Sequence, residues 1–152
     1  MNRYILPAII LANMASAEDI GVCRNIPYSQ NNCVRVLACI GDRGLTFDGR
    51  ARGWDAGTIT GAISDGTGCA GTWDQDGPMG TGIGKMSCED GTDVSVIYYS
   101  QDSITGTVVG RGVDTKKRAI RVWSGENVLQ FLTEKGAFGP ALPCVQGDIP
   151  IS

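Results

Sequence analysis

Apolar and polar residues alternate with a period of two along most of the chain after residue 32, and no window of a dozen residues shows a convincing helical apolar stripe. Such alternation is typical of β-strands with one buried face. It predicts strands over residues 33–40, 44–52, 58–64, 69–74, 83–88, 93–100, 105–112, 119–124 and 128–133. Residues 126–135 are also compatible with a short helix, and the pattern does not decide between the two.

Glycine occurs both inside these predicted strands and in the turns between them. It accounts for 22 residues and recurs in the pattern G-T-x-x-G at 57–61, 80–84 and 106–110. Asp-Gly pairs at 48–49, 65–66, 76–77 and 90–91 indicate hairpin turns, because type I′ turns need positive φ. About eight short strands with close turns predict an all-β fold, an antiparallel meander that forms a small barrel or sandwich. Glycines inside the strands favour a tightly curved sheet.

The start of the chain has the three parts of a secretory signal. Arg3 precedes an apolar run over residues 4–12, and Ala15-Ser16-Ala17 forms a small-residue exit. A membrane anchor would need about 20 apolar residues, more than this run contains. We therefore expect a signal peptide over 1–17 and a periplasmic or extracellular location, with no transmembrane segment once the signal is removed.

The rest of the chain, 18–152, is expected to form a single β domain. Its last part, 136–152, contains Pro140, Pro143 and Pro150 and is expected to be an irregular tail. We expect a monomer.

Six cysteines follow the signal, and an even number in an exported chain predicts disulfides. Cys33 and Cys39 lie on one predicted strand, roughly 20 Å apart, whereas a disulfide needs Cα atoms within about 7 Å. Cys69 and Cys88 flank a turn region and suit neighbouring strands. The preferred disulfide-stapled arrangement is Cys23–Cys33, Cys39–Cys144 and Cys69–Cys88.

Composition excludes several kinds of chemistry. The net charge of −3 argues against nucleic-acid binding, which depends on clustered cations. With no histidine, no C-x-x-C pair and the thiols in disulfides, we expect no metal, no cofactor and no nucleophilic triad. A carboxylate pair is the remaining option for catalysis, and the carboxylates are better explained as turn residues: Asp74, Asp76, Glu89, Asp90 and Asp93. We therefore expect no enzymatic activity.

Two groups of residues are candidates for binding. Trp54 and Trp73 would act as binding anchors if they are exposed. A basic segment could meet an acidic partner, a phosphate or an anionic lipid, and it contains Arg111, Lys116, Lys117, Arg118 and Arg121. The simpler interpretation of that segment is a solvated hairpin tip with residues 114–117 as its turn.

Part of the chain, over residues 85–144, resembles a known family. KMSCEDG at 85–91 and VSVIYY at 94–99 resemble the Tyr-x-Cys opening strand of periplasmic inhibitors of c-type lysozyme. RVWSG at 121–125 and Cys144 resemble that family's Trp-containing strand and closing cysteine. The resemblance implies a small antiparallel barrel and a Cys88–Cys144 disulfide. The family's inhibitory loop has no clear counterpart between Gly106 and Ala119, so no inhibitory residue is carried over.

These observations favour an exported, non-catalytic binding or inhibitor module, with an exported or periplasmic protein as its partner. One alternative is a ligand-carrying barrel of lipocalin type, which requires a lined cavity. The other is a carboxylate-based hydrolase, which requires two facing carboxylates about 5–9.5 Å apart.

Overall fold

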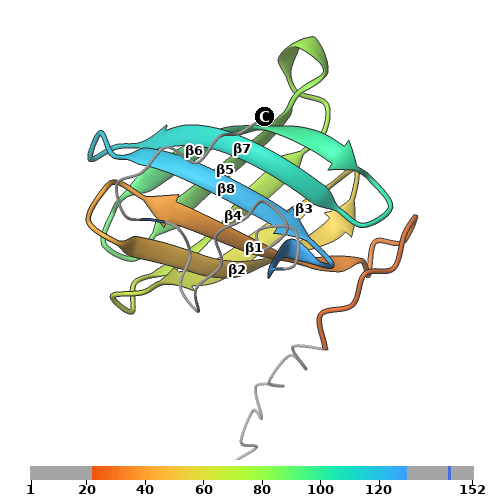
Figure 1. Cartoon of the computed structure of the whole chain (residues 1–152), viewed down its shortest axis with the longest axis horizontal. Coiled ribbons are helices and arrows are strands. Elements are labelled where there is room, and N and C mark those ends of the chain that lie inside the picture. The colour runs from red at the N-terminus through yellow and green to blue at the C-terminus, as the bar shows by residue number, and fades with distance from the viewer. Residues whose placement is uncertain (1–21, 130–143, 145–152) are drawn as a thin grey trace, which may run out of the picture.

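The protein is an eight-stranded antiparallel barrel closed by pairing between its first and last strands (Figure 1). The computed structural model describes residues 22–129 and Cys144. The strands follow one another around the barrel in chain order: β1 (Cys33–Ile40), β2 (Leu45–Trp54), β3 (Ala56–Ile63), β4 (Gly68–Asp74), β5 (Gly82–Cys88), β6 (Asp93–Asp102), β7 (Thr107–Asp114) and β8 (Ala119–Gly125). A 3-10 turn, η1 (Pro78–Gly80), lies between β4 and β5. The all-β meander is confirmed, and it forms a barrel.

The first eight predicted strands all occur, with ends displaced by no more than two residues. The ninth, over 128–133, is wrong at its start, because residues 128 and 129 are helical. Residues 130–133, the expected signal 1–17 and the tail 136–152, except Cys144, lie outside the described residues. Among the described residues, no helix is long and apolar enough to cross a membrane.

Two of the four Asp-Gly pairs form the expected hairpin turns, and a third, at 76–77, lies in the loop between β4 and η1. Gly66 and Gly91 have φ values of 95° and 82° in the β3–β4 and β5–β6 turns. The pair at 48–49 lies inside β2, so the turn expected there is wrong. Asp48 instead accepts hydrogen bonds from Arg35 on the neighbouring strand and from Arg50.

Aromatic rings fill the space left by glycines on their own strand or on the neighbouring one. Gly49 and Gly61 are paired in register across β2 and β3, and a Cβ on either would overlap the ring of Phe47. Gly82 is likewise paired with Tyr98, whose ring occupies the place of its missing Cβ. These close approaches explain why glycine recurs inside the strands of a narrow barrel.

Apolar side chains form one cluster inside the barrel and another outside it. The inner cluster contains Val36, Ala38, Ile40, Phe47, Ile63, Cys69, Cys88, Val94, Val96 and Ile120. The outer cluster covers β1 and β8 and contains Leu37, Cys39, Trp123, Val128 and Cys144. Strand β1 is therefore buried on both faces, which explains its nearly continuous apolar sequence.

The disulfides pair as their spacing predicted: Cys23–Cys33, Cys39–Cys144 and Cys69–Cys88. The last joins β4 to β5 inside the barrel, so the Cys88–Cys144 pair implied by the family resemblance is wrong. Three disulfides are consistent with an oxidising compartment, such as the periplasm or the cell exterior.

The glycine packing predicts different outcomes for two alanine substitutions. Gly61→Ala should lower the free energy of unfolding by about 1–3 kcal/mol, because the new methyl group overlaps Phe47 and the β2 backbone. The matched control is Gly84→Ala, whose Cβ would lie 3.7 Å from its nearest neighbour, Ile59 Cδ1. Denaturant unfolding measures both, and equal stability of the two variants would contradict this account.

The disulfides predict a second difference in stability. Cys39–Cys144 spans 105 residues and Cys23–Cys33 spans 10. In the loop-entropy description, replacing the long-range pair by alanines should cost about 2 kcal/mol more than replacing the short-range pair. Guanidinium unfolding of the two double variants tests this. If the Cys39→Ala/Cys144→Ala variant lost less unfolding free energy than the Cys23→Ala/Cys33→Ala variant, the loop-entropy explanation would be wrong.

Candidate ligand site inside the barrel

The two ends of the barrel differ. At one end, which we call the turn end, four hairpin turns at 41–44, 64–67, 89–92 and 115–118 join the strands. At the other, the tryptophan end, Trp54 closes β2 and Trp73 lies next to the last residue of β4. The tryptophan end also carries the η1 loop and the β6–β7 turn at 103–106.

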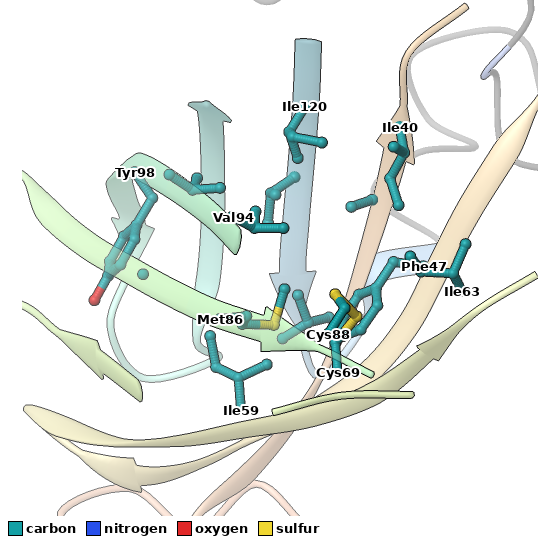
Figure 2. Close-up of a pocket in the computed structure, with 15 residues that line it drawn as sticks. Ile40, Phe47, Ile59, Ile63, Cys69, Met86, Cys88, Val94, Tyr98 and Ile120 are labelled. Atoms are coloured by element: carbon teal, nitrogen blue, oxygen red, sulfur yellow. A yellow bond between two sulfur atoms is a disulfide. The ribbon is translucent and has the colours of Figure 1, made fainter. Parts of the chain in front are cut away.

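An apolar hollow of about 60 Å³, the inner hollow, lies inside the barrel towards the turn end (Figure 2). Phe47 and the Cys69–Cys88 disulfide lie on one side of it and Tyr98 on the other. Aliphatic side chains supply most of the remaining lining: Val36, Ala38, Ile40, Ile59, Ile63, Val94, Val96, Ile120 and Val122.

A second hollow of about 80 Å³, the mouth hollow, lies at the tryptophan end. The aromatic side chains of Trp54, Trp73 and Tyr98 line it. Polar residues contribute as well, namely Asn32, Gln75, Ser103 and Ser124. Because Gln75 and Ser103 are solvent-exposed, this hollow extends to the protein surface.

One layer of side chains separates the two hollows. Val36, Ile59, Tyr98 and Val122 line both, and they come from β1, β3, β6 and β8. A dry apolar cavity of about 150 Å³ is large enough to bind benzene, and each hollow is smaller than that. The interior is therefore neither a wide calyx nor fully packed, and it would hold a single ring only if the layer between the two hollows moved aside.

The structure brings together the two tryptophans that the sequence singled out. The Trp73 indole N–H donates to the Arg52 carbonyl at 3.1 Å, which fixes its ring at the barrel wall. The Trp54 ring contacts that of Tyr28, with centroids 4.8 Å apart. Both indoles are half-buried and line the mouth hollow rather than projecting into solvent.

A disulfide-closed loop, residues 23–33, borders the tryptophan end. The Asn25 side chain donates to the Ile104 carbonyl at 2.7 Å, in the β6–β7 turn. The Gln30 and Asn32 side chains donate to the Trp54 and Gly53 carbonyls at 3.1 and 3.2 Å. Sequence reasoning did not identify this loop as part of the site, although the short Cys23–Cys33 spacing indicated its closure.

Tyr98 is the functional candidate that sequence reasoning missed. Its side chain is buried, and its hydroxyl has no hydrogen-bond partner among the described residues. Burial, and to a smaller extent the negative charge of Asp74, raises the pKa of Tyr98 well above its usual range. Tyr98 and Tyr99 are neighbours on β6 and therefore face opposite sides of the sheet, and Gly82, paired with Tyr98 on β5, leaves room for the inward ring.

The basic candidates lie away from the tryptophans. Lys116, Lys117 and Arg118 belong to the β7–β8 turn at the turn end, while Arg111 and Arg121 face each other in register on β7 and β8. The expected hairpin tip at 114–117 is confirmed by the bond from the Lys117 N–H to the Asp114 carbonyl. Lys116 pairs with Asp90 at 2.9 Å and Arg118 with Asp114 at 2.7 Å. Anion binding by this segment stays a prediction.

Of the carboxylates considered for catalysis, Asp74 and Asp90 make the local contacts of turn residues, whereas Glu89 and Asp93 bond to neighbouring strands. Asp74 accepts from the Asp76 N–H, Asp90 from the Thr92 N–H and Glu89 from the Gly68 N–H. Asp93 accepts from the Ser87 hydroxyl. Asp74 and Asp76 lie at the tryptophan end and the other three at the turn end, so the set is divided between the two ends.

No family model matches the sequence, and no curated protein matches it. Among solved structures, the chain is similar to a redesigned β barrel, mFAP0, bound to DFHBI. The match has 16% sequence identity and a TM-score of 0.49, and it covers 64% of this chain and 98% of that one.

The β7–β8 turn predicts a measurable contrast. The Asp114 side chain accepts from the Lys116 and Arg118 N–H groups and from the Arg118 guanidinium, and it is almost wholly buried. Asp114→Ala should therefore cost about 1–3 kcal/mol of unfolding free energy. Lys116→Ala, which removes an exposed ion pair in the same turn, should leave the thermal midpoint nearly unchanged. Similar losses in both variants would contradict the role given to Asp114.

Proposed function

We propose that this protein is an exported binding module that takes a small, mainly apolar molecule into its barrel through the tryptophan end. The observation that carries the proposal is the pair of hollows inside the closed barrel, separated by one layer of side chains. Ligand sites are typically concave and mostly apolar, with few polar groups. The mouth hollow combines these properties with an extension to the surface at Gln75 and Ser103.

The size and lining of the hollows limit how large the ligand can be. A bulky lipid or a tetrapyrrole exceeds the space, whereas a single ring fits with modest movement of Val36, Ile59 or Val122. This narrows the lipocalin-type alternative to a small cargo. Binding of an exported protein partner, as in an inhibitor, stays a prediction from the sequence.

Toluene binding tests the proposal. We expect saturable binding by isothermal titration calorimetry and a rise in the thermal midpoint that grows with toluene concentration, since a ligand that binds the folded state stabilises it. Val108→Phe, which fills the mouth hollow from β7, should weaken binding at least tenfold.

The matched control for this experiment is Val113→Phe. Val113 lies on the same strand, 53% exposed on its outer face, and the substitution should leave toluene binding unchanged. Ala51→Phe offers a second way to fill the mouth hollow if Val108→Phe does not fold. Absence of saturable binding to the wild-type protein, or equal binding by wild type and a folded blocking variant, would refute interior binding.

A further inference from the structure

The buried polar side chains that line the mouth hollow are Asn32, Tyr98 and Ser124, and they differ in whether they have partners. The Asn32 amide donates to the Gly53 carbonyl, and its oxygen accepts from the Ile26 N–H. The Ser124 hydroxyl donates to the Gly106 carbonyl at 2.8 Å. Tyr98 is 8% exposed, and its hydroxyl has no partner among the described residues.

An unpaired buried hydroxyl is unfavourable, because it has lost water without gaining a protein partner. The ring and the hydroxyl oxygen of Tyr98 both lie over Gly82, in the place of its missing Cβ. Packing against Gly82 thus explains the position of Tyr98, but it supplies no hydrogen-bond partner for the hydroxyl.

The Tyr98 hydroxyl is buried beside the two hollows, so a ligand would reach it through a small movement of the ring. Tyr98 belongs to the layer that lines both hollows. Figure 2 shows its oxygen pointing away from Phe47, Ile63 and the disulfide on the opposite side of the inner hollow. Two other buried side-chain atoms lack partners among the described residues, Asn25 Oδ1 and Thr92 Oγ1, but neither residue lines either hollow.

We propose that the Tyr98 hydroxyl is the hydrogen-bond donor that anchors the ligand, and that the ligand is a small, uncharged aromatic molecule with an oxygen acceptor, such as a phenol. This assignment rests on the proposed function and names the chemistry of the same site.

Three features of the site define this ligand class. The indoles of Trp54 and Trp73 and the Tyr98 ring offer aromatic contacts at the mouth. None of the described residues that line either hollow carries a charge, so an ionised ligand would lose its hydration without an ion partner. The negative charge of Asp74, which also acts on the Tyr98 hydroxyl, further disfavours an anion.

The experiment compares phenol and toluene, which have similar shapes, against wild type, Tyr98→Phe and Tyr99→Phe. Tyr99 is the matched control, because it is the next residue on β6 and is 58% exposed. We expect Tyr98→Phe to weaken phenol binding by about tenfold, the loss of one hydrogen bond, and to leave toluene binding unchanged. Tyr99→Phe should change neither affinity. Tyr98→Phe should also be at least as stable as wild type, because it removes an unpaired buried hydroxyl.

The outcomes separate this inference from the proposed function. If Tyr98→Phe binds both molecules as wild type does, or loses the same factor for both, the hydroxyl is not the anchor and interior binding still stands. If the wild-type protein does not bind toluene, the proposed function fails and the anchor fails with it. Isothermal titration calorimetry gives both affinities, with thermal unfolding of each variant as the check on folding.

Discussion

Pairing between β1 and β8 is the interaction on which the rest of the molecule depends. It joins residues 35–40 to 120–125 and turns a meander into a closed wall. Closure removes both free sheet edges and fixes which side chains point inward. Strand β1 contributes to both apolar clusters. Val36, Ala38 and Ile40 face the interior, whereas Leu37 and Cys39 pack against Trp123 on the outside. A polar substitution on either face would therefore act on the closing strand itself.

The space inside follows from how glycine and aromatic residues are distributed. An eight-stranded barrel is just wide enough to be filled by side chains or to hold one small ligand. Here Phe47 fills the room above Gly49 and Gly61, and Tyr98 fills the room above Gly82. Between these two rings the lining is mostly aliphatic, and the inner hollow remains. The glycines that let the sheet curve, together with the rings that cover them, thus determine how much space stays open inside the barrel.

Local patterns in the sequence predicted the strands and the disulfides, because period-two alternation and cysteine spacing are properties of short segments. The turn expected at Asp48-Gly49 was wrong because the dipeptide is the same in a turn and in β2, and only the register with β3 distinguishes them. The candidate site could be predicted from the sequence only in part. Trp54 and Trp73 were candidates, but their convergence requires the pairing of β2, β3 and β4. The burial of the Tyr98 hydroxyl depends on Gly82 on the neighbouring strand β5. The pattern of residues along β6 alone does not reveal that pairing.

The Cys39–Cys144 bond determines what a proteolytic cut does to the barrel. It encloses every hairpin turn of the barrel, from the β1–β2 turn to the β7–β8 turn, within one covalent ring. A protease that cuts any one of these exposed turns opens the ring but leaves the two pieces joined. The cut ends also remain paired in the sheet wall on both sides. A single nick would therefore add one water and leave the two pieces in one molecule until the disulfide is reduced, so the barrel can persist among proteases with its backbone broken.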